Sequence, residues 1–148
     1  MKYNECRFRF KLPTGWEDQT VYHFKGPDID GQSHTLMLTI VRNLADDDIE
    51  SFARDRINPI IENLQGLEVL KDEETTVEGC FPSHEFACRW IPGEGLQLFQ
   101  RYVFVVAHGM GFTFSATFSK KSHKLLGEQM TDVIESVLPG TYEPLEED

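Results

Sequence analysis

Cysteine and histidine residues at ligand-like spacing are the first candidates for chemistry in this sequence. Cys80, His84 and Cys88 recur every four residues, which resembles a metal-ligand set. They fall in a segment with the pattern of a strand, where four residues span about 13 Å at roughly 3.3 Å per residue. That distance is too long for one metal ion to bind all three side chains. We therefore expect no metal site here and no cofactor.

The other polar residues also fail to form a catalytic pattern. His23, His34, His108 and His123 are isolated, and single histidines on strands are usually exposed or satisfied by local hydrogen bonds. The acidic run at residues 46–48 is explained without a metal, because an Asp cap and acidic residues in the first turn favour a helix. The sequence has no phosphate-binding glycine loop, nucleophile elbow or carboxylate pair. It therefore predicts a binding module and not an enzyme.

A long apolar stretch, Leu96 to Phe118, is the element that we expect to position the binding residues. Its two β-branched and aromatic runs predict a β-hairpin that turns at Gly109 and Met110. This turn pairs Ala107 with Phe112, Val105 with Phe114 and Val103 with Ala116, and it puts Phe99 and Phe118 on the same side. We expect this side of the hairpin to face the core.

The opposite side of the hairpin is half apolar and half small hydroxyl. It carries no Asp, Glu or Lys, although the solvated face of an antiparallel sheet normally shows charges. We therefore expect both faces to be covered, one of them by the protein's own helices, while the pattern leaves open what covers the other. The strand predicted over His34–Arg42 extends the same pattern, with Leu36, Leu38 and Ile40 toward the core. The candidate client-binding residues are Met37, Thr39, Val41, Leu98, Gln100, Tyr102, Phe104, Val106, Thr113, Ser115 and Thr117.

The remaining elements complete a single domain over residues 1–148. Alternation predicts strands over Glu5–Leu12, Thr20–Lys25, Leu67–Glu78 and Cys80–Ile91. An apolar stripe at helical spacing predicts a helix from the acidic cap to Gly66, kinked or split at Pro59. A second helix is predicted from Ser119 or Ser122 to about Leu138. This order favours an α+β fold with an antiparallel, strongly curved sheet of about six to seven strands and two helices on one face.

The net charge and the cysteine content limit which classes of binding partner and which cellular compartment we expect. The net charge of −11 argues against binding to nucleic acid or to an anionic membrane. Three cysteines without framework spacing indicate a reducing compartment. No apolar signal region and no run of 18 apolar residues are present, so we expect a cytoplasmic protein that is not itself inserted in the membrane.

A resemblance to a known family rests on the segment from Phe10 to Phe24. This segment contains LPTGWEDQTV and precedes a strand, an acidic-capped helix and the long apolar hairpin. It resembles the effector-associated (Eag) chaperones of bacterial type VI secretion, within the DcrB-like group with the Mog1/PsbP fold. The similarity covers nearly the whole chain, and the GWEDQT run is more specific than the LPxGW turn.

The resemblance implies a homodimeric cytoplasmic chaperone. Such a chaperone holds the N-terminal transmembrane segments of a PAAR-containing toxin effector until the toxin is loaded on the secretion machine. The family supplies no strict motif for individual binding residues, so the candidate surface rests on the strand pattern alone.

The predicted dimensions agree with such a client. A transmembrane helix of about 20 residues is about 30 Å long, and a strand over Leu96–His108 is about 40 Å long. Thr113, Ser115 and Thr117 offer the small surface over which membrane helices approach closely, Gln100 offers hydrogen bonds, and Met37 adapts to varied apolar surfaces.

Four alternatives stay open, and the last of them is a small-molecule enzyme, which a convergent cluster of polar groups in a closed pocket would favour. The uncharged face could instead pack a homodimer or lie under loops of the same chain. A Mog1-like regulator would bind a nucleotide-switch protein through a charged surface, which the net charge of −11 allows. A DcrB-like periplasmic lipoprotein would share the fold but needs a signal sequence and a lipobox cysteine.

Overall fold

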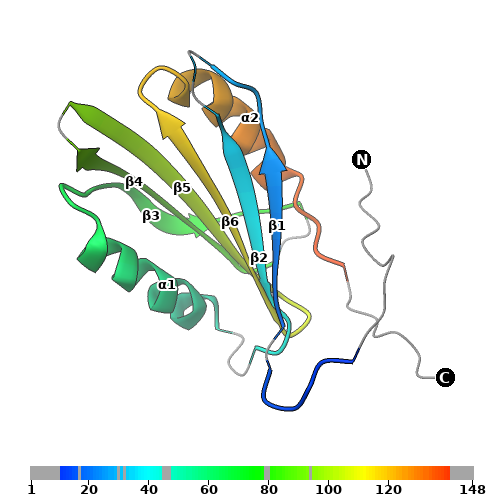
Figure 1. The fold of residues 1–148 in the computed structure, drawn as a ribbon. Coiled ribbons are helices and arrows are strands. Elements are labelled where there is room, and N and C mark those ends of the chain that lie inside the picture. The colour runs from blue at the N-terminus through cyan, green and yellow to red at the C-terminus, as the bar shows by residue number, and fades with distance from the viewer. Residues whose placement is uncertain are drawn as a thin grey trace.

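The protein forms one antiparallel sheet with a helix on each face. The computed structural model describes residues 11–16, 18–29, 31, 33–44, 48–78, 81–93 and 95–140. Within them, six strands run in the order β1-β2-β6-β5-β4-β3 (Figure 1). The strands are β1 (Gln19–Lys25), β2 (Thr35–Val41), β3 (Glu68–Thr75), β4 (Ser83–Gly93), β5 (Leu96–Ala107) and β6 (Met110–Ser119), and the helices are α1 (Ile49–Asn63) and α2 (His123–Glu135). The predicted α+β class, with an antiparallel sheet and two helices, is confirmed.

One predicted strand cannot be compared with the structure. The strand expected over Glu5–Leu12 lies almost entirely outside the described residues, and the two described positions, Lys11 and Leu12, belong to no strand. Along the rest of the chain, the predicted strands and helices correspond to observed elements within a few residues.

The central hairpin turns one residue earlier than the sequence predicts. Its loop is His108-Gly109, and both residues have positive φ, 55° and 71°. A two-residue loop with φ positive at both positions matches the twist of the flanking strands. Ala107 therefore pairs with Met110, and Val105 pairs with Phe112. The predicted pairs were wrong by two positions, which leaves every side chain on its predicted face.

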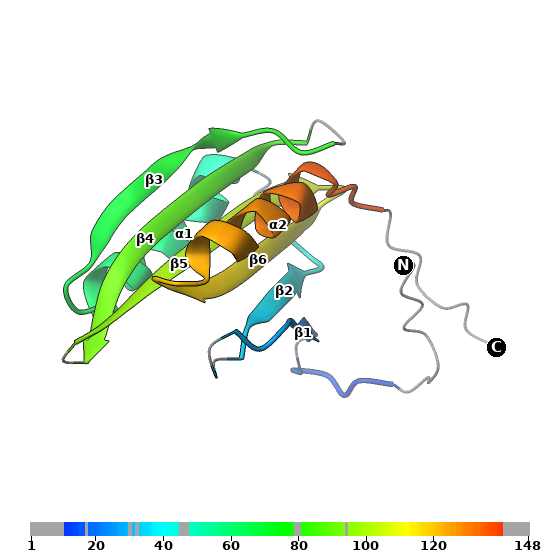
Figure 2. The same cartoon turned by 90° about the horizontal axis from the view of Figure 1, so that it is seen from above.

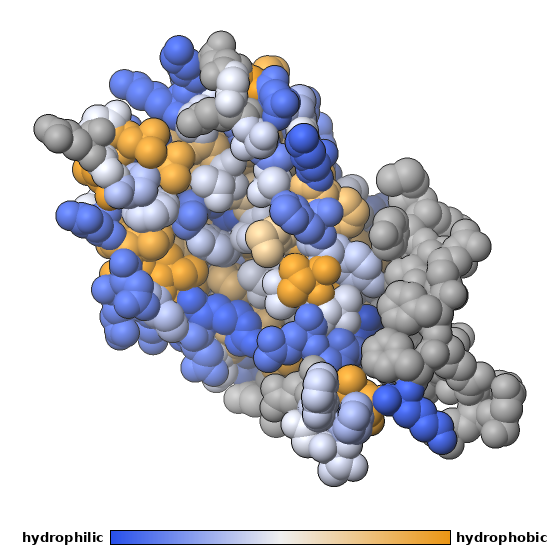
Figure 3. All heavy atoms as spheres, in the orientation of Figure 1, coloured by the Kyte–Doolittle hydropathy of each residue, from blue (hydrophilic) through white to orange (hydrophobic). Residues whose placement is uncertain are grey.

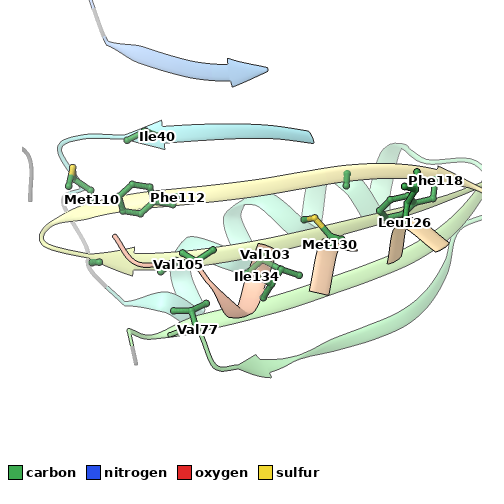
Figure 4. Close-up of a cluster of buried hydrophobic side chains, with 13 residues drawn as sticks. Ile40, Val77, Val103, Val105, Met110, Phe112, Phe118, Leu126, Met130 and Ile134 are labelled. Carbon is green, nitrogen blue, oxygen red and sulfur yellow. The ribbon is translucent and has the colours of Figure 1, made fainter. Parts of the chain in front are cut away.

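The larger core lies between the sheet and α2. Ser122 precedes this helix as its N-cap residue, and Leu126, Met130 and Ile134 are buried on one side of it. Figure 4 shows these three side chains directed toward the strands, against the core side chains Val103 and Val105 of β5. Alternate residues of β2 and β6 join the same core, as the sequence predicts for Leu36, Leu38 and Ile40.

The position of α1 differs from the prediction. The side chain of Asp48 caps α1 by accepting from the backbone N–H of Glu50, and the helix continues through Pro59 to Asn63 without splitting. Its buried side, with Phe52 and Ile57, packs on the sheet face opposite α2. The strands thus separate the two helices (Figures 1 and 2). The expectation that both helices cover one face was wrong, because an apolar stripe shows that a helix is buried but not against which face.

Neither described helix has both the length and the apolar composition needed to cross a membrane.

Candidate functional site

The predicted binding residues share one face of the sheet, the face on which α1 packs. They alternate along β2, β5 and β6, and strand pairing aligns them in rows that also include β1. One row contains Val21, Thr39, Thr113 and Phe104, and the next contains His23, Met37, Ser115 and Tyr102. The pattern along each strand therefore becomes a continuous surface across four strands.

Helix α1 covers one part of this surface. Phe104 is fully buried, and its ring contacts the ring of Phe52 edge to face at 6.2 Å. Val106 is buried beside it, in the same cluster. Gly111 lies under Phe52 on β6, where any Cβ would overlap the phenylalanine ring. Phe104 and Val106 are core residues under α1, which corrects their assignment to a client-binding surface.

Two further predicted residues lie at the margin of the covered part. Val41 and Tyr102 are partly buried and pack against the α1 cluster. The ring of Tyr102 stacks on Phe104 at 6.2 Å between centroids. These two side chains form the boundary between the covered and the uncovered part of the face.

The uncovered part, which we call the open strip, crosses β1, β2 and β6. Val21 is 48% exposed and Met37 is 38% exposed. The neighbouring hydroxyl residues, Thr39, Thr113, Ser115 and Thr117, are partly exposed. Figure 3 views this face and shows pale, weakly polar surface over the middle of the sheet, between α1 and β1. The open strip consists of Val21, His23, Met37, Thr39, Thr113, Ser115 and Thr117.

A polar pair lies beside the open strip on β5. The hydroxyl of Tyr102 donates to the side-chain oxygen of Gln100 at 2.6 Å. Burial, together with the nearby Cys88, raises the pKa of Tyr102 to about 12, so the hydroxyl remains a donor at neutral pH. Within the described part of the chain, the amide nitrogen of Gln100 has no hydrogen-bond partner. Gln100 therefore offers a donor next to an otherwise weakly polar surface.

A small hollow lies at one end of the open strip. It has a volume of about 180 Å³, and Leu98 and Thr117 line it together with Thr35 and Ser119. The structure thus places Leu98, Gln100, Met37, Thr39 and the three hydroxyl residues of β6 around one accessible surface.

A serine and a histidine at the start of α2 have the appearance of a nucleophile and its base. The Oγ atom of Ser122 lies 2.7 Å from Nε2 of His34, whose Nδ1 lies 3.1 Å from the carbonyl oxygen of Pro27. Because a carbonyl only accepts, Nδ1 carries the proton and Nε2 accepts from the serine hydroxyl. Ser122 is fully buried, however. The pair therefore ties the loop before β2 to the start of α2.

Comparison with known proteins assigns the family. The DcrB family model matches residues 9–136. The chain belongs to the DcrB family. No curated protein sequence matches it. A family match over most of the chain agrees with the wider group to which the sequence resemblance pointed.

Solved structures show the same fold at low sequence identity. The DcrB-family chain is similar to PA94 of Pseudomonas aeruginosa, a protein of unknown function described as a possible regulator. The TM-score is 0.75 at 16% sequence identity, and the match covers 95% of this chain and 96% of that chain. LpqN of Mycobacterium tuberculosis, involved in cell envelope biogenesis, has a TM-score of 0.50, 14% identity and coverages of 82% and 84%. CyanoP, the PsbP of Synechocystis, has a TM-score of 0.50, 10% identity and coverages of 84% and 94%. The fold is thus PsbP-like.

The polar clusters of this DcrB-family chain connect its elements. Asp72 of β3 binds Nε2 of His84 and an Nη2 of Arg54, both at 2.5 Å, and so joins β3, β4 and α1. Among the described residues, no group of three or more His, Cys, Asp or Glu side chains is placed to hold a metal ion. Cys88 is buried, and burial raises the pKa of its thiol to about 11, so the nucleophilic thiolate is disfavoured.

Sequence reasoning missed two members of the open strip. Val21 and His23 belong to a strand that was predicted, but they were not assigned to a face. Their pairing with Thr39 and Met37 places them there. The available signal was the alternation of these residues with Tyr22 and Phe24. Because Tyr22 packs on the α2 core, Val21 and His23 must point to the opposite face.

Proposed function

We propose that this DcrB-family protein is a non-catalytic chaperone or adaptor that holds an apolar helix of a partner protein on the open strip. The proposed client is the N-terminal transmembrane segment of a PAAR-containing toxin of type VI secretion, which this protein shields before export. The observation that carries the proposal is an accessible, uncharged sheet surface that α1 leaves uncovered. The LPTGWEDQTV segment and the DcrB family support it.

The composition of the open strip suits an apolar helix. Membrane helices associate by close backbone approach over small residues and by a few side-chain hydrogen bonds. Thr39, Thr113 and Ser115 are small, and Val21 of β1 and Met37 of β2 provide apolar contact beside them. Gln100 supplies a donor at the margin. A partner helix would bury exactly those apolar groups that the isolated chain exposes.

The decisive experiment places a charge in the open strip. Met37→Glu changes an outward side chain that is 38% exposed, so we expect the domain to fold. Docking an apolar helix would strip water from the new carboxylate, at a cost of at least about 3 kcal/mol. Client affinity should fall on the order of a hundredfold. The matched control is Leu125→Glu, which changes an exposed leucine on α2 away from the strip.

The assay is co-expression with the N-terminal fragment of a PAAR-containing effector, followed by pull-down and circular dichroism. We expect the wild type and Leu125→Glu to retain the fragment and Met37→Glu to lose it while remaining folded. Equal retention by the folded Met37→Glu variant would place client binding elsewhere or refute it.

A second candidate function is favoured by the charge of β3. This edge strand contains Glu68, Asp72, Glu73 and Glu74 within eight residues. A Mog1-like regulatory module would use such an acidic edge to bind a basic surface of its partner, because complementary charge steers association. Loss of partner binding after Glu73→Lys with Glu74→Lys, but not after Met37→Glu, would favour this second function.

A further inference from the structure

A second concave site lies on the opposite face of the sheet. Between α2 and the strands β3, β4 and β5 is a cavity of about 450 Å³, partly walled by Leu70, Phe99 and Phe118. Sites for small molecules commonly have volumes of about 300–1,000 Å³, with apolar walls and a few convergent polar groups. This cavity has both features and shares no residue with the open strip.

The polar groups of the cavity are held in fixed positions. Glu85 is almost fully buried, and it pairs with Nζ of Lys71 at 2.9 Å and with Nε of Arg101. Nη1 of Arg101 donates to the carbonyl oxygen of Gly127 at 3.1 Å and to the hydroxyl of Thr131 at 2.9 Å. Its other terminal nitrogen, Nη2, has no hydrogen-bond partner in the described part of the chain. The guanidinium is thus pre-positioned with two donors available.

The charge of the cavity is opposite to that of the protein. Its cationic side chains are Lys71, Arg101 and Lys124, and its carboxylates are Glu85 and Glu128. With a neutral histidine these sum to +1, in a chain whose net charge is −11. A local positive site on an acidic protein attracts a small anion, whereas the surrounding surface repels it.

An aromatic platform lies beside these charges. The ring of His123 stacks on Phe99 with 4.4 Å between centroids and 12° between planes. Burial, and to a lesser extent the charge of Lys124, lower the pKa of His123, so this ring is neutral at neutral pH. The outer face of such a stacked, uncharged pair is a surface on which another aromatic ring stacks favourably.

The helix that borders the cavity has an unexplained glycine. Gly127 lies in the interior of α2, where glycine destabilises a helix relative to alanine. Apart from its chain neighbours and the backbone of its own helix, no described atom lies within 4 Å of the position that its Cβ would occupy, so packing within the protein does not require a glycine. His123, Gly127 and Thr131 share one flank of the helix by their four-residue spacing. A glycine there keeps the cavity wide.

We propose that this cavity binds a small, flat aromatic carboxylate. The aromatic ring lies against Phe118 and the stacked pair of Phe99 and His123, and the carboxylate accepts from Nη2 of Arg101 and from Lys124. The absence of a side chain at position 127 provides the space for the ring. Of the residues proposed to bind the client, Gln100 also lines this cavity, but the proposal does not rest on the client-binding function.

Binding of 2-naphthoate tests the proposal. We expect isothermal titration calorimetry on the full chain to give a Kd below about 1 mM, with 2-naphthalenemethanol, the neutral analogue, binding at least tenfold more weakly. Gly127→Phe should fill the cavity and abolish binding, whereas Gly127→Ala should retain it. Lys124→Gln should weaken binding about threefold to tenfold, and Lys121→Gln, which changes an exposed lysine outside the cavity, should not change it.

A titration of the wild type provides an independent readout. The other charged groups that line the cavity with His123 are Lys124 and Glu128 of α2 and Lys71, Glu85 and Arg101 of the strands. NMR of the imidazole should show a rise in its pKa when 2-naphthoate is bound, because the anion stabilises the protonated ring. Absence of binding at 1 mM, equal affinity for the neutral analogue, unchanged binding by a folded Gly127→Phe variant, or an unchanged His123 pKa under saturating ligand would each overturn the proposal.

Discussion

At the scale of single residues, the buried carboxylate of Glu85 is held by ion pairs with Lys71 and Arg101. Burial disfavours the charge on Glu85, but hydrogen bonds from Lys71 and Arg101 outweigh that effect and hold its pKa below the usual value. Asp72 is similar, because bonds from Arg54 and His84 outweigh its desolvation and lower its pKa. Each carboxylate links strands to a neighbouring element, so its charge contributes to the stability of the fold.

These lowered pKa values predict acid sensitivity with a definite sign. A carboxylate whose pKa is depressed by folding stabilises the protein above its unfolded pKa, and that contribution disappears as pH falls through the folded value. We expect the contribution of these carboxylates to be constant from about pH 7 to pH 5.5 and to be lost below the usual glutamate pKa of 4.5, whereas the lowered pKa of His123 makes the free energy of unfolding decrease already below the usual histidine pKa of 6.5. Urea unfolding at a series of pH values measures this. A stability that rises on acidification from pH 5 to pH 3 would contradict it.

Removing the charge of Glu85 tests the same cluster directly. Glu85→Gln leaves Lys71 and Arg101 without their shared carboxylate, and breaking such a buried pair costs about 3 kcal/mol. Its unfolding free energy should also depend less on pH between 5 and 3 than that of the wild type. The control Glu73→Gln, at a side chain that is 63% exposed, should change stability by less than about 0.5 kcal/mol.

A glycine on β6 is required by the position of α1. Because the ring of Phe52 occupies the space of a Cβ at Gly111, we expect Gly111→Ala to push the helix away and to cost about 1–3 kcal/mol. Combining it with Phe52→Leu should cost less than the sum of the two single changes, which a double-mutant cycle in urea measures. Gly93→Ala has open space at its Cβ and serves as the control. Strict additivity would mean that the ring and the glycine do not interact.

At the scale of elements, the sequence predicted the strands well and the packing of α1 poorly. The alternation of side chains along β5 and β6 determines which residues share a face, and an error of two positions in register does not change that. The turn was misplaced because His108, a non-glycine residue, takes a positive φ. The face that α1 covers depends on the path of the chain after β2, which no local pattern records.

The placement of α1 also changes what the hairpin tolerates. The sequence pattern assigned Phe104 to an uncovered binding face and Val105 to the core. Both side chains are fully buried, in opposite cores. We therefore expect Phe104→Ala to lower the unfolding free energy by about 3–5 kcal/mol, whereas Ser115→Ala on the open strip stays within about 0.5 kcal/mol. Thermal and urea denaturation measure both changes in stability. A Phe104→Ala variant as stable as the wild type would show that α1 does not pack on Phe104.

At the scale of the whole molecule, the two faces of one sheet carry different surfaces. The α1 face leaves an uncharged strip, and the α2 face has a cavity with apolar walls and a few charged groups. The part of the open strip on β2 and β6 was predicted from a lack of charge along the strands, because the solvated face of an antiparallel sheet normally carries charged side chains. The cavity was not predicted, since Lys71, Arg101 and Gly127 come from distant parts of the chain and carry no shared motif.

The last prediction concerns assembly, which could also account for the uncharged strip. We expect light scattering at micromolar concentration to give a dimer with twice the chain mass of 17.0 kDa. If the strip binds a client and the dimer forms elsewhere, Met37→Glu should keep the dimer mass while losing the client fragment. If the strip is instead the dimer interface, the same charge would be desolvated in the dimer, and the variant should become a monomer. A dimeric Met37→Glu variant without client binding therefore supports the chaperone proposal, and a monomeric one assigns the strip to the dimer interface.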